Sequence, residues 1–162
     1  MRSTRSIPNP LELDPIEKVF PPKTIVVYTD GGASPNPGHA GLGAVLICEG
    51  KILDIWEYIG HSTNNIAELM AIGRALEHIK NKTLPVLLYS DSTYAIGVLS
   101  GRMKAAKNRE LIASIQAEMR NFPSLSLLKV KAHSGVTYNE RVDRLVARAR
   151  ETRASGSERS EI

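Results

Sequence analysis

Four acidic residues occupy positions that suit metal chemistry: Asp30, Glu68, Asp91 and Asp143. Asp30 ends the apolar stretch TIVVYTD, and Asp91 ends the similar stretch PVLLYSD. Glu68 follows STNN at the start of a predicted helix, whereas Asp143 lies within a later one. Carboxylates that converge on one point repel each other unless a cation lies between them, and hard divalent cations prefer oxygen ligands. The four acids therefore predict a metal-dependent site for phosphoryl transfer.

The hydrophobic pattern predicts an α/β fold that positions these acids. Three apolar stretches joined by short links predict an antiparallel meander. Apolar residues at spacings of three and four then predict helices that alternate with two further strands. We therefore expect a mixed five-stranded sheet, three antiparallel strands followed by two parallel ones, flanked by helices. The predicted strands are 25–30, 42–49, 52–59, 84–90 and 125–130, and the predicted helices are 65–80, 92–99, 108–120 and 138–151.

Asp30 and Asp91 are expected to lie side by side if their strands are neighbours. A strand–helix–strand connection makes a right-handed crossover, which predicts that these two strands are parallel. Ligands gather at the carboxyl ends of parallel strands in such sheets. Simpler interpretations stay open at this level. An Asp after a strand is often a turn or helix-capping residue, and Asn65 with Glu68 fits a capping box.

Segment composition predicts one catalytic domain, residues 24–151, between two polar ends. Residues 1–23 contain five prolines and no clear period, so we expect an extended or disordered leader. Residues 152–162 are predicted to be a frayed polar tail. Residues 31–41, GGASPNPGHAG, are too rich in Gly and Pro for regular structure and predict a loop whose amides could contact phosphate.

Composition narrows the class of protein. The 162-residue chain is 42% hydrophobic, and no apolar run is long enough for a membrane span. The start of the chain lacks the apolar core of a signal peptide, so a cytoplasmic location is expected. The single cysteine, Cys48, excludes an internal disulfide and is interpreted as a small core residue. A net charge of +4 favours a polyanionic partner, although mild positive charge also serves solubility.

Two further features carry weaker signals. His133 lies in a predicted loop near a glycine, and a histidine side chain is suited to exchange protons near neutral pH, so it is a candidate for proton transfer, with a plain exposed histidine as the alternative. A basic stretch precedes a predicted helix and is a candidate for tracking phosphates, although any basic loop looks similar. Its members are Arg102, Lys104, Lys107 and Arg109.

Four motifs together resemble type 1 ribonuclease H. They are YTDGGASPNPG, TNNIAELMAI, YSDSTYAI and VKAHSGVTYNERVDRLV, which stand in the family's order within residues 24–150. The resemblance implies the ribonuclease H-like fold and hydrolysis of the RNA strand of RNA–DNA hybrids. It also implies Mg²⁺ or Mn²⁺ as cofactor, two ions per site, and products with 5′-phosphate and 3′-hydroxyl ends. No membrane and no obligate protein partner are expected.

The resemblance also implies roles for individual residues. The four acids match the metal ligands; our hypothesis is that Asp30 bridges both ions, that Glu68 and Asp91 bind the first, and that Asp143 binds the second. His133 matches a flexible-loop histidine linked to proton transfer or product release. The positions that match substrate contacts are Asn36, Thr63, Asn64, Asn65, Thr93, Lys107 and Asn108.

Departures from the family pattern affect substrate binding rather than the acids. Residues 100–107 lack the longer, tryptophan-containing basic insertion of many relatives, so hybrid binding is expected to be weaker or more sensitive to salt. Thr93 replaces a frequent Gln, and Val136 replaces a frequent His. Two other classes of function stay open: DNA strand transfer or resolution on the same fold, and a non-catalytic hybrid-binding module. An origin as the ribonuclease domain of a reverse transcriptase also stays open.

Overall fold

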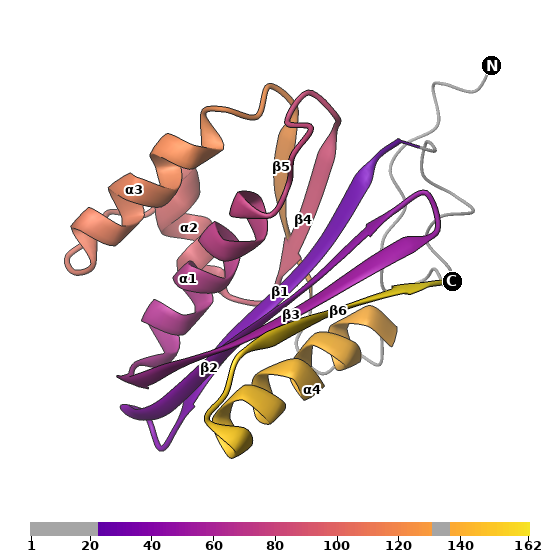
Figure 1. The fold of residues 1–162 in the computed structure, drawn as a ribbon. Helices are drawn as coiled ribbons and strands as arrows, with labels where there is room; N and C mark the ends of the chain where they lie inside the picture. The colour runs from indigo at the N-terminus through magenta and orange to yellow at the C-terminus, as the bar shows by residue number, and fades with distance from the viewer. Residues whose placement is uncertain (1–22, 131–136) are drawn as a thin grey trace.

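Six strands and four helices make up the described part of the chain, residues 23–130 and 137–162 of this computed structural model (Figure 1). The strands are β1 (Ile25–Ser34), β2 (Gly38–Cys48), β3 (Lys51–Ser62), β4 (Val86–Ser90), β5 (Leu125–Lys129) and β6 (Gly156–Glu161). The helices are α1 (Asn64–Glu77), α2 (Thr93–Ser100), α3 (Arg109–Met119) and α4 (Thr137–Thr152). The sheet has the order β5-β4-β1-β2-β3-β6. β1, β4 and β5 are parallel to one another, whereas β2, β3 and β6 each pair antiparallel with the strand before them in that order.

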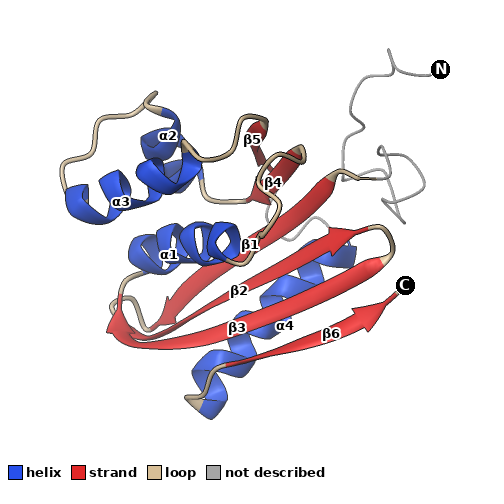
Figure 2. Cartoon of the chain, turned by 45° about the horizontal axis from the view of Figure 1, so that its top comes forward, coloured by secondary structure: helices blue, strands red, loops and turns tan. Residues whose placement is uncertain are grey.

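Two apolar layers cover the faces of the sheet, because successive side chains of a strand point to opposite faces. Val27 belongs to the layer under α1, α2 and α3, whereas its neighbours Val26 and Tyr28 belong to the layer under α4. Figure 2 shows α4 alone on its face and the other three helices on the opposite one. The predicted α/β class and the predicted order of the first nine elements are confirmed.

Helix α4 lies close to β2 because glycines face it. A Cβ atom on Gly41 would lie 2.9 Å from the Cβ of Ala149, and one on Gly43 would lie 3.1 Å from the carbonyl oxygen of Val142. Arg141 fixes the same helix to β3 through a two-pronged ion pair: its Nε lies 2.9 Å and its Nη2 2.7 Å from the two carboxylate oxygens of Asp54. The position of α4 over the sheet is therefore set by close packing and by one charge-assisted contact.

The loop predicted for residues 31–41 is wrong for most of its length. β1 continues to Ser34 and β2 begins at Gly38, so only a tight turn separates the two strands. Glycine and proline are disfavoured inside strands by their intrinsic preferences. Here Gly31 and Gly41 serve tertiary packing, because helices α1 and α4 lie where their side chains would be. Propensity alone does not show that contact.

The predicted count of five strands is also wrong, because part of the predicted polar tail forms β6. This strand pairs with β3 from Lys51 opposite Glu161 to Trp56 opposite Gly156. Five of its six residues are exposed, so it offers no apolar alternation from which to predict a strand. Backbone pairing at the sheet edge and the contact between Gly156 and the Trp56 ring hold it in place.

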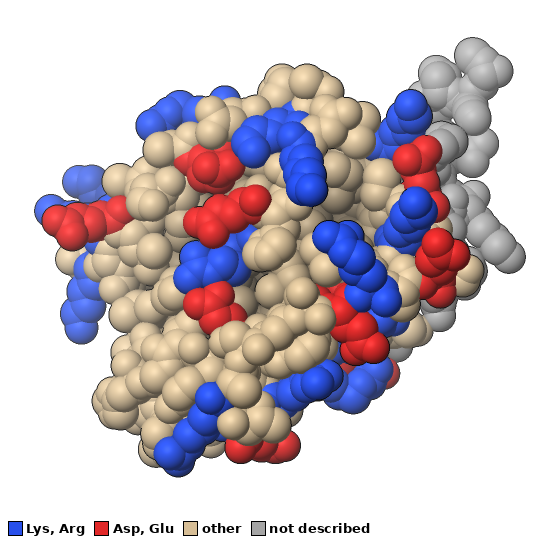
Figure 3. Space-filling model, viewed as in Figure 1, with Lys and Arg blue, Asp and Glu red and all other residues tan. Residues whose placement is uncertain are grey.

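Several predictions concern residues that the structure does not describe. The leader prediction falls on residues 1–23, of which only Lys23 is described, and both His133 and Val136 lie in the undescribed segment 131–136. Every helix in the described ranges is too short or too polar to span a bilayer. On the face shown in Figure 3, Lys and Arg are interspersed with Asp and Glu rather than gathered in one basic field.

Candidate metal centre

The two strand-end acids lie side by side because their strands are adjacent. β1 and β4 are parallel, and Thr29 is in register with Ser90. Asp30 and Asp91 follow this pair directly, so both carboxylates reach the same edge of the sheet. The prediction that these strands are parallel neighbours is confirmed.

Glu68 joins them because Gly31 allows α1 to touch β1. A Cβ atom on Gly31 would fall on the carbonyl group of Ala67 and would lie 2.7 Å from the backbone nitrogen of Glu68. Only a residue without a side chain allows a helix backbone to approach a strand backbone so closely. The glycine that follows Asp30 therefore holds Glu68 beside it.

Asp143 approaches from the other face of the sheet. Asp30 is in register with Gly43 of β2, and the position of a Gly43 Cβ would lie 3.1 Å from the carbonyl oxygen of Val142. Asp143 is the next residue of α4, and its side chain hydrogen-bonds with that of Asp30. Thus α1 and α4, on opposite faces, each bring one acid beside Asp30 of β1.

The resulting geometry fits a divalent cation. One carboxylate oxygen from each of Asp30, Glu68 and Asp91 lies within 4.8 Å of the other two. The Oε1 atom of Glu68 is buried and has no hydrogen-bond partner among the described residues. A buried carboxylate oxygen without a donor is costly unless a cation satisfies it. The donor set consists of oxygen only, which suits Mg²⁺ or Mn²⁺ rather than softer metals.

Burial and mutual repulsion keep protons on this cluster when no cation is bound. Burial is the largest cause that raises the pKa of Asp30 to about 8, followed by its hydrogen bond with Asp143 and the charge of Asp91. Burial also raises the pKa of Glu68 to about 10, followed by the charges of Asp30 and Asp91. Such raised values are typical of carboxylates that share one site. A cation reverses both effects, because it stabilises the charged form.

Tyrosines pack beneath the acids on the α4 side. The rings of Tyr28 and Tyr89, each two residues before a strand-end Asp, stack with centroids 5.1 Å apart. Tyr138 of α4 lies 5.8 Å from Tyr28. Burial raises the pKa of Tyr89 to about 12. These rings belong to the apolar layer between the sheet and α4.

The capping-box interpretation of Glu68 is wrong. Helix α1 begins at Asn64, and its N-cap is Thr63, whose Oγ1 accepts a hydrogen bond of 3.2 Å from the backbone nitrogen of Ile66. Asn65 is already inside the helix, so it cannot cap it. Glu68 is therefore free of a capping role and points to the acids.

The predicted substrate contacts fall into two groups. In the first, Asn36 Oδ1 accepts from the backbone nitrogen of Asn64 at 3.0 Å, and Asn64 Oδ1 accepts from Ala33 at 2.7 Å. These bonds tie the β1–β2 turn to the start of α1, next to Thr63 and the exposed Asn65. Asn36 and Asn64 therefore have a structural role whatever else they contact.

The second group lies around α2 and the start of α3. Thr93 is exposed in the first turn of α2, immediately before Tyr94. Asn108 donates from Nδ2 to the hydroxyl of Tyr94 at 3.1 Å and adopts a left-handed backbone conformation before α3. Lys107 precedes it and is exposed. The structure thus brings Thr93, Lys107 and Asn108 into one neighbourhood.

Arg150 is a cation beside Gly32 and Asn64 that the sequence analysis did not select. A Cβ atom on Gly32 would lie 3.5 Å from the Nη1 atom of Arg150 and 3.7 Å from the Oδ1 atom of Asn64. Gly32 is two residues beyond Asp30 on the same side of β1. The spacing between Asp143 and Arg150 is two helical turns, which places both on one face of α4. This spacing is the signal that could have identified it.

Known sequences similar to this chain share one family. A sequence model of RNase H matches residues 22–151, which include all four acids. The ribonuclease H of Chlorobaculum parvum is 36% identical over 137 residues, which cover 76% of this chain and 92% of that protein. The ribonuclease H of Gluconobacter oxydans is 34% identical over 140 residues, which cover 78% of this chain and 92% of that protein.

Solved structures agree with the sequence comparison. LC11-RNase H1, isolated from compost by a metagenomic approach, aligns with a TM-score of 0.72 at 34% identity and covers 81% of this chain and 98% of that one. LC11-RNase H1 in complex with an RNA/DNA hybrid aligns with a TM-score of 0.68 at 33% identity, over 80% of this chain and 98% of that one. RNase H1 from the halophilic archaeon Halobacterium salinarum aligns with a TM-score of 0.71 at 28% identity and covers 80% of this chain and 98% of that one.

The contact at Gly31 predicts a difference between two adjacent substitutions. Gly31→Ala is expected to lower the free energy of unfolding by about 1–3 kcal/mol, because the new methyl group overlaps the α1 backbone. Gly32→Ala is the matched control, since its Cβ meets atoms only at ordinary contact distance, 3.5 Å or more. Urea denaturation of both variants measures the difference. Equal stabilities would contradict the close approach of α1 and β1.

The raised pKa values predict that cation affinity depends on pH. At neutral pH the cation-free folded protein holds protons on Asp30 and Glu68 that the unfolded chain has lost. Its free energy of unfolding is therefore expected to fall as pH rises from about 4 towards 8–10. Cation binding displaces the same protons, so affinity is expected to rise with pH over that range.

Calorimetric titration with Mg²⁺ or Mn²⁺ at several pH values tests this linkage. Buffers of different ionisation enthalpy report how many protons leave on binding. Asp30→Asn serves as the control, because it removes one titrating group and one ligand. Binding that releases no protons and does not change with pH would contradict the shared, buried cluster.

Proposed function

This chain belongs to the ribonuclease H family, and we propose that it cuts the RNA strand of RNA–DNA hybrids by metal-dependent hydrolysis. The convergence of Asp30, Glu68 and Asp91, with ligand oxygens within 4.8 Å of one another, is the observation that carries this proposal. The relative LC11-RNase H1, solved with an RNA/DNA hybrid, supports the same substrate for this chain. Attack by water would leave a 5′-phosphate and a 3′-hydroxyl.

The chain's own residues would hold and orient the reacting groups. Two divalent cations, when bound, supply the charge that activates the attacking water and stabilises the leaving 3′ oxygen. Asp30 contacts Asp143 on one side and shares the pocket of Glu68 and Asp91 on the other, which supports a bridging role. Glu68 and Asp91 would bind the first cation, and Asp143 the second. The tyrosines below them would exclude water from that side.

Substrate selection would depend on shape and on the ribose 2′-hydroxyl rather than on base sequence. Asn36, at the β1–β2 turn, and Asn64 and Asn65, at the start of α1, would contact the sugar–phosphate backbone, with Thr63 near a DNA phosphate. Thr93, Lys107 and Asn108 would contact the hybrid on the α2–α3 side. The link of residues 100–107 carries three cations but lacks the longer basic insertion of many relatives, so hybrid binding is expected to be weaker. The expected cytoplasmic location and the lack of an obligate protein partner stay predictions.

Two other functions predict different outcomes in a single assay. A strand transferase or resolvase would act on DNA without ribonucleotides, and a non-catalytic module would bind hybrid without cutting it. Incubation with matched hybrid, DNA duplex and RNA duplex, each with and without Mg²⁺, separates the three. We expect cleavage of the hybrid only, in the RNA strand only, and only with the cation.

Asp30→Asn is expected to lower the rate of hybrid cleavage at least about 1,000-fold, because it removes the ligand shared by both cations. The measurement is single-turnover cleavage at saturating Mg²⁺, with circular dichroism to confirm folding. Glu158→Gln, at an exposed position of β6, is the control and is expected to match the wild type. Substantial turnover by Asp30→Asn would rule out the bridging role.

His133→Ala is expected to slow turnover by about 100-fold without abolishing it, because proton transfer by a positioned histidine contributes about that much. The readout is the dependence of kcat on pH. The wild type should show an inflection near neutrality that the variant lacks. A variant profile that superimposes on that of the wild type would refute a role for His133 in proton transfer or product release.

A further inference from the structure

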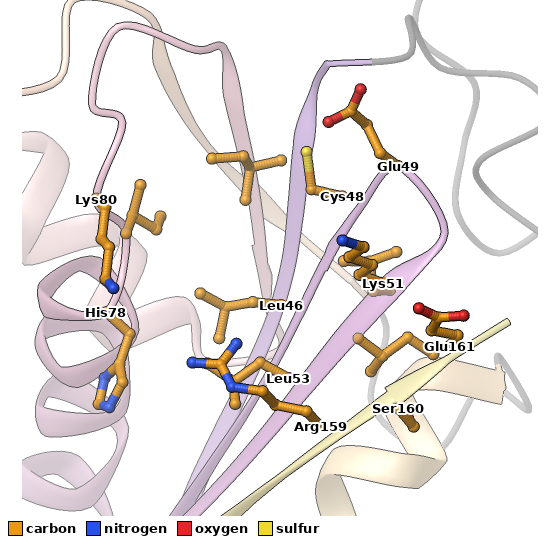
Figure 4. Close-up of a pocket in the computed structure, with 14 residues that line it drawn as sticks. Leu46, Cys48, Glu49, Lys51, Leu53, His78, Lys80, Arg159, Ser160 and Glu161 are labelled. Carbon is orange, nitrogen blue, oxygen red and sulfur yellow. The ribbon is translucent and has the colours of Figure 1, made fainter.

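A cavity of about 620 Å³ opens at the end of the sheet where β1 begins, away from the acids (Figure 4). Ile25, Leu46, Leu53 and Ile79 give it an apolar floor. Cys48, the single cysteine of the chain, lies in its wall and is half-buried. Its volume falls within the range of ligand sites, and its apolar floor with a charged edge suits an amphipathic occupant.

Charges around this cavity are ordered along it. Glu49, Lys51 and Glu161 lie at the β2–β3 turn, where both signs are present. The other end of the cavity is basic (Figure 4). Its cations are Lys80, which lies just beyond α1, and Arg159, which lies two positions farther from that turn along β6 than Glu161. Neither Arg159 nor Lys80 forms an ion pair with a carboxylate of residues 23–130 or 137–162. These two cations are available to an acidic partner.

The chain enters the described domain beside this cavity. Ile25 lines it, and Lys23 lies close enough to Cys48 for its charge to lower the pKa of that thiol. Burial, which is the largest influence, and the charge of Glu49 both raise the pKa of Cys48, so the net shift is upward. Residues that precede Lys23 are therefore tethered at the rim, which gives them an effective concentration in the millimolar range.

We propose that residues 11–20 of this same chain, LELDPIEKVF, dock in the cavity; we call them the docking segment. Its apolar and acidic residues alternate at Leu11, Glu12, Leu13 and Asp14. Alternation in an extended chain places apolar side chains on one side. That side matches the floor of Ile25, Leu46 and Leu53, which accounts for an apolar cavity at this end of the sheet.

The order of charges in the docking segment matches the order around the cavity. Glu17 and Lys18 are close to the point of entry and would face Lys51 and Glu49 at the turn, where both signs are present. Glu12 and Asp14 are farther along and would meet Arg159 and Lys80. Asp14 lies nine positions before Lys23, a stretch that spans about 30 Å when extended. The tether is therefore long enough to cross the cavity in this direction.

Alkylation of Cys48 tests the docking without reference to catalysis. The full-length chain has one thiol, so iodoacetamide reports on this cavity alone. In the triple variant Leu11→Asn, Leu13→Asn, Ile16→Asn the reaction rate is expected to rise at least about tenfold, because loss of one buried aliphatic side chain already shifts a docking equilibrium by that factor. The matched control Ser3→Asn, Thr4→Asn, Ser6→Asn is expected to react like the wild type.

Charge reversal supplies an independent readout. Lys80→Glu with Arg159→Glu is expected to speed alkylation, although added negative charge near a thiol by itself slows it. Glu12→Lys with Asp14→Lys in the same chain is expected to restore protection. Reversal of Arg120, an exposed cation outside the cavity, is the control and is expected to leave the alkylation rate unchanged.

Three results would overturn the proposal: equal rates for the wild type and the apolar triple variant, failure of the second charge reversal to restore protection, or protection that grows with protein concentration. The last would assign the cavity to a second copy of the chain. Cleavage of hybrid measured on the same samples checks folding. If no sample cleaved hybrid, the proposed function would fail, while the alkylation rates would still decide the docking.

Discussion

Repulsion among buried carboxylates is the constraint on which the rest of this structure depends. Asp30, Glu68 and Asp91 bring like charges within 4.8 Å in a partly dry setting, an arrangement that no local preference of the chain favours. The folded state tolerates it by keeping protons on Asp30 and Glu68 or by accepting cations in their place. The geometry of the acids therefore gives the folded chain an affinity for divalent metal ions. Rigid elements must hold the acids in place against their mutual repulsion.

Glycines provide much of this rigidity. Gly31 allows the backbone of α1 to rest on β1, and Gly43 allows the backbone of α4 to approach β2 from the other face. Because both contacts involve backbone atoms, neither helix can shift without a clash or a void. Thr63 fixes the start of α1, and the pair of Arg141 with Asp54 fixes α4 over β3. Each acid is thus positioned by packing contacts of residues that are close to it in the chain.

The two ends of β1 carry different chemistry. Asp30 stands near the middle of the strand, at the acid cluster, whereas Ile25 begins it and lines the apolar cavity. A separation of five residues in a strand is about 17 Å, so an occupant of the cavity would not touch a hybrid held at the acids. The same central strand supports both sites, and its neighbours on either side, β2 and β4, bury its first half.

The sequence by itself determined the α/β class, the order of the first nine elements and the identity of the acids, because hydrophobic periodicity and strand-end positions are local properties of the chain. Only the tertiary structure decided that residues 31–34 continue a strand, that Thr63 rather than Asn65 caps α1, that exposed residues 156–161 form an edge strand, and that Arg150 reaches Gly32. Each of these depends on a partner distant in sequence: a helix backbone against a glycine, a strand edge against a polar segment, or a side chain two turns beyond Asp143. Local preference carries no information about such partners, because their contact energy exists only once the chain has folded.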